Sequence, residues 1–542
     1  MAEMKKQNFM HGAAILAAGV VIMKILGAIY KIPLQNILGD TGYGYFNAAY
    51  SIYNVLLTIS TAGLPVALSR MISEANTLNR PRQARRTFLV AMAVLCVLGV
   101  LFSALMFLFP TEMAIFFVST PAVSRCVHAL SPAVFLVCLT SAYRGFIQGS
   151  GNMTPTTVGQ VLEVLVKVIV GLALSLWLTR QGSSLPVTSA GAIFGVTAGS
   201  LAALIYMYLC YRVGYRNHSR AACAASDDRP DSVRSTLFRF VSVGVIITLG
   251  ASVMSVITLL DTKLIKSTLP GVPGIGPALA DELYGSYSAV QTLYNVPASF
   301  IMPMVIAVVP AIAAATAKHD SAEAGLIAES GLRVSAVVAM PMGVGLSVLA
   351  SPIVGVLYPR TNVMGATMLS YLGIAAIFVC ISLVTNSILQ AGGNERLPIF
   401  SMLAGGAVKI GANLLLVRRP EINILGGPIG TIGCYAVICI LNCIFIYRSL
   451  DVKPNYFRAF LRPLISAAVM GASAWAVYGL GSRLLHAGPP RRDLPTLIAL
   501  AFAIGVAVLV YLVMVSVTRS LTREDLKLIP KGEKIARILR FK

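Results

Sequence analysis

A few ionisable residues lie inside long apolar segments, and they are the chain's first candidates for chemistry. Lys24 sits in the middle of segment 11–32, too far from either end for its ammonium group to reach water comfortably. A charge at the centre of a membrane costs at least about 2.5–3.5 kcal/mol, so its presence indicates a function. A cation facing a wet cavity would bind an anion such as a phosphate or diphosphate. The alternative is a lysine that leans toward the outer headgroups.

Three further charges need an explanation. Glu163 and Lys167 are four residues apart, a spacing that allows them to pair along one face of a helix. We interpret this pair as a structural clasp, with a proton or cation site as the alternative. Asp261, near the end of another apolar segment, either binds a coupling cation or caps its helix.

Two apolar segments carry polar stripes whose members share one helical face. The first stripe consists of Asn47, Ser51, Asn54 and Thr58. The second consists of Ser288, Thr292, Asn295 and Ser299, with Tyr287 and Gln291 beside it. Two equivalent stripes predict one aqueous cavity, in which Asn54 and Asn295 contact the substrate. Hydrogen bonding between helices is the alternative, and we favour it for any single Ser or Thr.

The residue types needed for catalysis in a membrane do not cluster. A glycosyltransferase or phosphatase would require grouped carboxylates, histidines or a phosphate-binding loop near an interface. The five histidines and nine cysteines have no metal-ligand or disulfide spacing. We therefore predict a transporter rather than an enzyme, with no metal and no cofactor. A scaffold without transport would leave the paired stripes unexplained.

Long apolar helices must position these residues. Of 542 residues, 57% are hydrophobic and 12% are charged, against roughly 25% charged in a soluble domain. Crossing the hydrocarbon takes roughly 20 apolar residues. The sequence thus predicts an all-α polytopic membrane protein of about fourteen transmembrane helices. Their ranges are 11–32, 43–69, 87–110, 128–148, 156–179, 189–211, 238–262, 282–317, 331–358, 364–391, 398–417, 426–447, 459–484 and 494–518.

Basic residues set the expected orientation and partners. With both termini in the cytoplasm, about 29 of the 43 Lys and Arg residues lie inside. The net charge of +22 therefore indicates contact with anionic lipids of the inner leaflet and not with nucleic acid. The main basic groups are Arg80, Arg82, Arg85, Arg86, the loop 212–239 and the tail after Arg519.

The sequence contains an internal repeat. Tyr43-Gly44 and Tyr53-Asn54-Val55 recur 241 residues later as Tyr284-Gly285 and Tyr294-Asn295-Val296. At a shift of 242, Gln148, Gly151, Asn152 and Lys167 recur as Gln390, Gly393, Asn394 and Lys409. Six helices per copy is an even number, so the two copies run the same way through the membrane. Parallel repeats of this kind bind substrate between their halves.

The repeat predicts the domain boundaries. Residues 1–213 form an N-terminal six-helix lobe, 214–236 a cytoplasmic basic linker, and 237–450 a C-terminal six-helix lobe. Two additional helices occupy 451–518, and 519–542 is a basic cytoplasmic tail. The second copy carries about ten extra residues around 271–280, where Gly and Pro predict a loop. Gly63-Leu64-Pro65 and three prolines, Pro297, Pro303 and Pro310, are expected to bend their helices.

Five motifs together resemble a known family. They are Lys24-Ile25-Leu26-Gly27, the turn from Gly39 to Gly44, Tyr53-Asn54, Gly63-Leu64-Pro65, and the turn from Gln148 to Asn152. The chain resembles the polysaccharide exporters of the multidrug/oligosaccharidyl-lipid/polysaccharide superfamily. Within it, the chain is similar to the stage V sporulation protein B-like branch, and hence to the lipid II flippases.

The resemblance implies an alternating-access flippase of the bacterial plasma membrane, moving an undecaprenyl-diphosphate-linked saccharide. It implies that Lys24, with Lys31 as a second candidate, binds the diphosphate. It also implies that helices within 459–518 hold the polyprenyl tail, and that Na⁺, H⁺ or the membrane potential drives transport. We expect a monomer.

One departure from the family concerns segment 282–317, which has no basic residue. This leaves other undecaprenyl-linked glycans open beside lipid II. The alternative function is a multidrug antiporter that exchanges organic cations. An antiporter of that kind would need carboxylates in its cavity, and only Glu163 and Asp261 are available.

Overall fold

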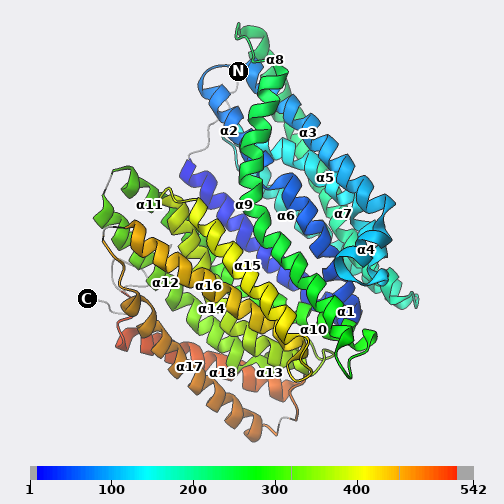
Figure 1. The fold of residues 1–542 in the computed structure, drawn as a ribbon, viewed down its shortest axis with the longest axis vertical. Coiled ribbons are helices and arrows are strands. Elements are labelled where there is room, and N and C mark those ends of the chain that lie inside the picture. Colours follow the sequence, from blue (N-terminus) through cyan, green and yellow to red (C-terminus); the bar gives the residue numbers. More distant parts are fainter. Residues whose placement is uncertain (1–8, 319, 451, 487, 522–542) are drawn as a thin grey trace. The chain divides into compact units, whose positions relative to one another are not determined.

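The computed structural model describes residues 9–318, 320–450, 452–486 and 488–521, which form α-helices joined by short turns (Figure 1). The first half contains α1 (Phe9–Thr61), α2 (Leu64–Thr77), α3 (Pro81–Leu108), α4 (Pro110–Val118), α5 (Ser124–Gly149), α6 (Thr154–Arg180), α7 (Leu185–Cys210), α8 (Arg216–Ala225) and α9 (Val233–Thr268). The second contains α10 (Pro277–Tyr294), α11 (Val296–Ala317), α12 (Ser321–Val348), α13 (Ala350–Leu357), α14 (Met364–Ala391), α15 (Arg396–Leu416), α16 (Gly426–Ser449), α17 (Tyr456–Leu484) and α18 (Leu494–Val517). No strand occurs among the described residues.

The predicted class, an all-α polytopic membrane protein, is confirmed. Within the described residues, 12 helical segments are long and apolar enough to cross a membrane. One of them, Ile25–Thr77, covers parts of both spans expected at 11–32 and 43–69, and within α1 two helices meet at a kink where Gly39 is not helical. Gly39 has φ 66° and ψ −179°, a conformation that glycine adopts far more easily than other residues. The count of about fourteen spans stays a prediction.

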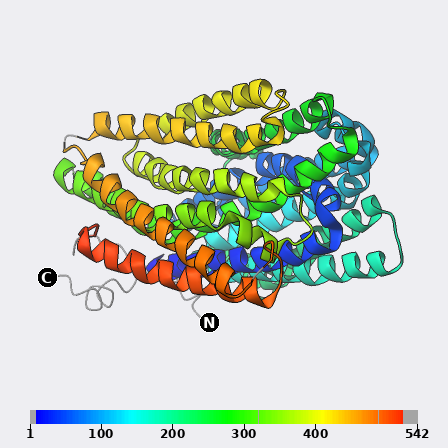
Figure 2. The same ribbon diagram turned by 90° about the horizontal axis from the view of Figure 1, so that it is seen from below.

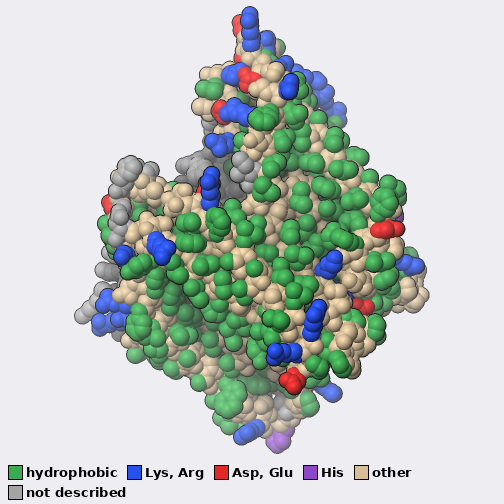
Figure 3. Space-filling model, in the orientation of Figure 1, with side chains coloured by type: hydrophobic (Ala, Val, Ile, Leu, Met, Phe, Trp, Pro, Cys, Tyr) green, Lys and Arg blue, Asp and Glu red, His purple; other side chains and the backbone are tan. Residues whose placement is uncertain are grey.

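The surface has the character expected of a protein in lipid. Hydrophobic side chains cover most of the face seen in Figure 3, and Lys and Arg gather near α8. Large apolar residues are exposed on many helices, including both tryptophans, Trp177 on α6 and Trp475 on α17. Such surface would be unfavourable in water but not in hydrocarbon. The chain is therefore a multi-pass membrane protein.

The helices group into two compact units. Unit 1 comprises Met1–Leu38 and Gly42–Ser267, and unit 2 comprises Gly39–Thr41 and Thr268–Lys542. The sequence repeat assigned residues from 237 onward to the second lobe, whereas the structure groups α9 with unit 1. The reason is close packing against the break between α1 and α2. There the Gly63 backbone N–H donates to Thr248 Oγ1 at 3.1 Å, and a Cβ on Gly63 would lie 2.1 Å from the Gly244 carbonyl oxygen.

Close helix contacts depend on small residues in unit 1. Helices α6 and α7 touch through Gly171, Gly195 and Gly199, and a Cβ on Gly195 would lie 2.6 Å from the Lys167 carbonyl oxygen. In unit 2, α17 and α18 form a pair that lies side by side in both views (Figures 1 and 2), and α17 packs on α12. The two additional helices predicted after the repeat are thus part of unit 2.

The repeat is visible in the backbone. Gly151 and Gly393, 242 residues apart, have φ of 84° and 81°. In both turns the glycine N–H bonds to the carbonyl three residues back, and the next Asn N–H bonds to the carbonyl five residues back. These left-handed glycines end α5 and α14 in the same way.

Connections between the copies differ from expectation in two places. The linker predicted as a loop contains a π-helical turn, Tyr211–Tyr215, and α8; Ala221, Ala222, Ala224 and Ala225 favour that helix. The extra loop around 271–280 ends at Gly276, because Pro277 begins α10, a position that proline favours.

Each copy also contains a break between two helices. The break expected at Gly63 is confirmed, since α1 ends at Thr61 and α2 begins at Leu64. In the second copy the break lies at Asn295, two residues before Pro297.

Candidate functional site

Lys167 lies at the midpoint of α6, 13 residues from Thr154 and 13 from Arg180. Each end of the helix is therefore about 20 Å away along the axis. Its Nζ lies 5.0 Å from the centre of the Tyr50 ring and 5.7 Å from that of Tyr30, both on α1. Cation–π contacts stabilise an ammonium group by roughly 0.5–2 kcal/mol but leave its charge in place.

Glu163 does not pair with Lys167, and the predicted clasp between them is wrong. The partner of Glu163 is Arg144 on α5, whose Nη2 donates to Oε2 at 2.8 Å. The ion pair ties the end of α5 to α6, and its side chains are 16% and 24% exposed. The spacing of four residues made the pair with Lys167 possible, but α5 brings a guanidinium group that offers better geometry to the carboxylate.

Lys31 belongs to the same group of charges. It is half-buried on α1 and lies within electrostatic range of Lys167. We call Lys31, Arg144, Glu163 and Lys167 the cationic cluster; three cations and one carboxylate give it a formal charge of +2. Lys24 is also on α1, but its side chain lies outside the described residues.

Aromatic side chains of α1 pack against one another beside Lys167. Tyr43, Phe46, Tyr50 and Tyr53 follow one another along α1 with ring centres 5.6–6.3 Å apart. The Tyr30 hydroxyl donates to the Ala192 carbonyl at 3.1 Å, which fixes its ring against α7. The tyrosines beneath Lys167 are thus held by their own packing.

The first polar stripe is engaged largely with its own helix. Asn47 Nδ2 donates to the Tyr43 carbonyl at 2.9 Å. Ser51 and Thr58 also contact α9, at 3.5 Å from Thr262 Oγ1 and 3.1 Å from Ser255 Oγ respectively. These contacts are the bonding between helices that we favoured for single Ser and Thr residues. Asn54 is half-buried, and its side-chain amide has no hydrogen-bond partner among the described residues.

The remaining predicted residues lie on other helices. Gln291 and Asn295 belong to unit 2, where Asn295 is exposed and its Nδ2 donates to the Gln291 carbonyl at 2.7 Å. Lys409 is buried on α15, also in unit 2. Asp261 is 3% exposed on α9 in unit 1. The structure therefore brings together Lys31, Glu163 and Lys167 of the predicted residues.

Comparison with known proteins gives the family. A family model described as polysaccharide biosynthesis protein matches residues 9–316, more than half of the chain. The chain belongs to this family. It is 26% identical to the uncharacterized membrane protein YabM of Bacillus subtilis (strain 168), over 99% of this chain and 97% of the relative.

Two further relatives come from the same organism. Identity to stage V sporulation protein B is 21%, covering 97% of this chain and 98% of the relative. Identity to lipid II flippase MurJ is 22%, covering 93% and 94%. These relatives confirm the branch that the sequence motifs indicated.

Solved structures show the same fold. An inward closed conformation of lipid II flippase MurJ matches with a TM-score of 0.68 at 13% identity, covering 93% of this chain and 98% of that one. An inward-facing multidrug resistance transporter of the MATE family in the MOP superfamily matches with a TM-score of 0.61 at 13% identity, covering 82% and 98%. These likenesses show that this chain has the fold of both solved structures.

Sequence reasoning missed two charged residues that the structure places in ion-pair or hydrogen-bond networks. Arg144, six residues before the turn at Ser150, could have been noticed as a charge close to the repeated Gln148–Asn152 motif. Asp40 lies within the segment from Gly39 to Gly44, which the sequence analysis treated only as a motif of the family. It accepts hydrogen bonds from Ser286 Oγ at 2.9 Å, from Thr361 Oγ1 at 2.8 Å and from the Asn362 N–H at 2.8 Å, all in unit 2.

The ion pair of the cationic cluster should be strongly coupled. We expect Arg144→Gln and Glu163→Gln each to destabilise the protein, and the double variant to cost less than their sum by about 1–2 kcal/mol. Removing one partner leaves the other charge uncompensated in an apolar environment. Thermal unfolding in detergent, analysed as a double-mutant cycle, measures the coupling.

The matched control is Arg239–Glu74, which has the same 2.8 Å separation in unit 1 but side chains 52% and 42% exposed. Its coupling should be below about 0.5 kcal/mol, since water screens exposed pairs. Equal coupling for both pairs would show that the surroundings of Arg144–Glu163 do not behave as an apolar interior.

Proposed function

We propose that the protein is a flippase that moves an undecaprenyl-diphosphate-linked saccharide across the bacterial plasma membrane by alternating access. The observation that carries this proposal is the +2 charge of the cationic cluster, centred on the midpoint of a membrane-spanning helix. Charges so placed are costly unless they face water or a ligand. The names of the relatives, lipid II flippase and stage V sporulation protein B, support the substrate class.

The headgroup would bind as an anion. Lys167, Lys31 and Arg144 offer ammonium and guanidinium donors for the diphosphate oxygens, and charge-assisted bonds of this kind are the strong ones. Glu163 would orient Arg144 and reduce the net attraction, so that the ligand can leave on the far side. Lys24 is a further candidate. Asn54 would contact sugar or peptide, and we retain Asn47, Gln291 and Asn295 as candidates for the same task.

The multidrug antiporter fits this cluster less well. An organic cation would need a carboxylate free to receive it, and Glu163 is engaged by Arg144 at 2.8 Å. The excess of positive charge would repel such a substrate. The glycan itself stays open between lipid II and other undecaprenyl-linked saccharides.

A groove in unit 2 suits the polyprenyl tail. Its volume is about 990 Å³. It is lined by Met340, Ile374, Ile377, Phe378, Ile381, Cys439, Ile440, Cys443, Ile444, Tyr447, Arg448, Tyr456, Phe460 and Leu464. Arg448 is the only charged residue among them. The resemblance assigned this role to helices within 459–518; here α17 supplies one wall, and α14 and α16 supply the others.

Orientation and coupling complete the proposal. Both termini would be cytoplasmic, as the basic residues indicate, and the protein would act as a monomer. Coupling to Na⁺, H⁺ or the membrane potential is expected for this superfamily. Asp261, buried on α9 beside the Thr262 that contacts Ser51, is the candidate carboxylate.

Removing one cation of the cluster should slow translocation. In liposomes containing fluorescent undecaprenyl-diphosphate sugar, we expect Lys167→Gln to lower the initial rate about tenfold, because a charged hydrogen bond is worth roughly 1.5–3 kcal/mol. Arg180→Gln, at the exposed end of the same helix, is the control and should stay within about twofold.

Two results would contradict the anion site. One is Lys167→Gln flipping the lipid at the wild-type rate. The other is transport of an organic cation by the wild type with no movement of the lipid, which would establish the antiporter instead. Lys24→Glu in the same assay tests the additional cation, and normal flipping by that variant would remove Lys24 from the site.

A bulky side chain in the groove of unit 2 should slow the translocation of a substrate with a long polyprenyl tail more than that of one with a short tail. Ile440 is 58% exposed in the groove, and Ile440→Trp should lower the rate for the undecaprenyl substrate about fivefold by occupying the space of the tail. A farnesyl analogue with the same headgroup should be much less affected. The control is Leu415→Trp, at a residue 69% exposed on α15 and outside the groove. An equal loss with both analogues would argue against tail binding here.

Neutralising Asp261 should uncouple transport from its driving force. We expect Asp261→Asn to retain translocation in the absence of any gradient and to lose the acceleration produced by the coupling ion. The assay follows lipid translocation while a sodium gradient, a proton gradient and a voltage are imposed in turn. If the wild type responds to none of the three, Asp261 has no part in energy transduction.

A further inference from the structure

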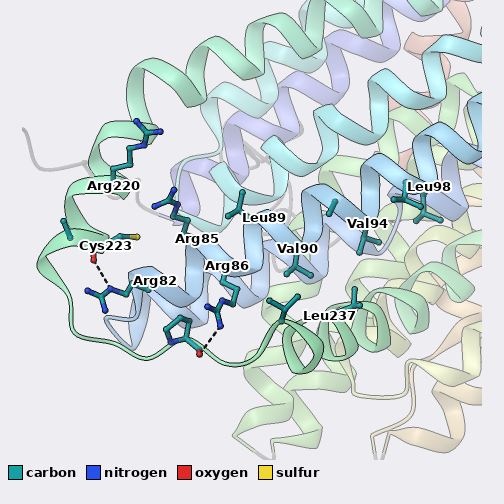
Figure 4. A pocket seen from close by; sticks show the side chains of 15 residues that line it. Arg82, Arg85, Arg86, Leu89, Val90, Val94, Leu98, Arg220, Cys223 and Leu237 are labelled. Atoms are coloured by element: carbon teal, nitrogen blue, oxygen red, sulfur yellow. Dashed lines mark hydrogen bonds between the residues drawn. The ribbon is translucent and has the colours of Figure 1, made fainter.

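A second groove lies in unit 1, and none of its lining residues belongs to the cationic cluster. Its volume is about 1020 Å³, and its walls are α3, α8, the segment before α9 and the start of α9 (Figure 4). One end is basic, with Arg82, Arg85, Arg86 and Arg220. The rest is apolar except for its backbone. The groove therefore has the two-part character of a lipid: a charged end and a hydrocarbon end.

Two of the arginines are held in place by neutral partners. Arg82 Nε donates to the Cys223 carbonyl at 3.0 Å, and Arg86 Nη1 donates to the Pro230 carbonyl at 3.3 Å (Figure 4). Arg86 Nη1 also donates to the Asp231 carbonyl. A carbonyl fixes the direction of a guanidinium group without cancelling its charge. Both side chains are thus oriented and remain electrostatically available.

The other two arginines are available for a ligand. Arg85 and Arg220 are exposed, and neither has a hydrogen bond or ion pair among the described residues. Figure 4 shows both side chains at the same end of the groove, Arg85 from α3 and Arg220 from α8. Two guanidinium groups from different helices can bind one phosphate between them.

Nearby carboxylates are already engaged. Asp231 Oδ1 accepts from Arg80 at 2.9 Å. Asp228 accepts the backbone N–H groups of Arg82 and Gln83 at 3.2 and 3.1 Å, and so caps α3. Burial raises the pKa of Asp228, but hydrogen bonds from Ser226, Gln83 and Arg82 outweigh burial and hold that pKa below its usual value. Asp228 therefore reduces the field of Arg82 but leaves Arg85 and Arg220 uncompensated.

The apolar wall has the length of one leaflet. Along α3 it runs from Leu89 to Leu98, and Val233 and Leu237 face it from α9. Nine residues of helix rise about 14 Å. Half of the hydrocarbon thickness is about 15 Å. An acyl chain could therefore follow the groove from the headgroup level to the middle of the bilayer.

We propose that this groove binds one anionic phospholipid of the inner leaflet. Its phosphate would lie between Arg85 and Arg220, and an acyl chain would extend along α3 and α9. The positive charge of the arginines favours an anionic headgroup. The apolar wall matches the length of one leaflet, which favours a membrane lipid over a soluble phosphate. The bound lipid would fasten α8 and the segment 226–232 to α3. This site is independent of the transported substrate and of the cationic cluster.

Native mass spectrometry of the full chain in detergent with added phosphatidylglycerol tests the headgroup contacts. We expect the double variant Arg85→Gln/Arg220→Gln to weaken the tightest bound phosphatidylglycerol about tenfold. The control is Arg212→Gln/Arg234→Gln, which removes the same charge from exposed residues outside the groove. The control should change affinity less than about twofold. Equal losses would mean a diffuse attraction to basic surface and would overturn the site.

A second pair of variants tests the acyl chain. Val97 is 66% exposed in the groove and Val100 is 52% exposed on α3 outside it. We expect Val97→Trp to weaken phosphatidylglycerol at least about fivefold, since it fills the path of the chain, and Val100→Trp to have little effect. Unfolding temperatures near that of the wild type show that the variants are folded.

Competition identifies the occupant. Phosphatidylcholine and free glycerol phosphate should each fail to displace phosphatidylglycerol at comparable concentration. Displacement by glycerol phosphate would show that the apolar wall contributes nothing, and the lipid proposal would be wrong. Tight binding of a polyprenyl phosphate with no binding of phosphatidylglycerol would make the groove a substrate site and would equally overturn the proposal.

Discussion

A charged side chain in the middle of a membrane-spanning helix must be compensated, and the architecture of unit 1 follows from that constraint. Helix α6 carries Glu163 and Lys167 one turn apart, and they are compensated in different ways. The carboxylate binds Arg144 from α5, while the ammonium group lies over two tyrosine rings of α1. These contacts connect α6 to both α5 and α1 near the middle of α6. Because an aromatic face stabilises a cation without neutralising it, the cluster keeps its positive charge.

Duplication of the helices did not duplicate this chemistry. At the shift of 242, Arg144 corresponds to Asn386 and Glu163 corresponds to Gly405. In unit 2, Asn386 Oδ1 accepts from Asn442 Nδ2 at 2.7 Å, so an amide pair exists where α5 has its guanidinium group. A Cβ on Gly405 would lie 2.6 Å from the Cys434 carbonyl oxygen. A glutamate could not occupy that position without separating α15 from α16. Packing thus enforces the electrostatic difference between the copies.

Much of this could be predicted from the sequence, because it depends on local pattern. Hydropathy gave the helices, and polar residues in register gave the repeat, down to the left-handed glycines at Gly151 and Gly393. The partner of Glu163 could not be predicted, since the spacing of four to Lys167 satisfied every local rule while Arg144 is adjacent only in the folded chain. The grouping of α9 with unit 1 was missed for a related reason: it depends on Gly63 and Gly244 meeting across 181 residues of sequence. Contacts between distant segments leave no periodic signal.

The placement of the two tryptophans gives each unit its own optical reporter. Trp177 and Trp475 are the only tryptophans in the chain, and both side chains are more than half exposed, one on α6 of unit 1 and one on α17 of unit 2. Indole emission in hydrocarbon is quenched by brominated acyl chains to a degree that depends on depth. Replacing either indole by Phe would leave a single tryptophan, on the helix of Lys167 or on a helix that lines the groove of unit 2. Fluorescence spectroscopy could then follow the two halves separately without any attached dye.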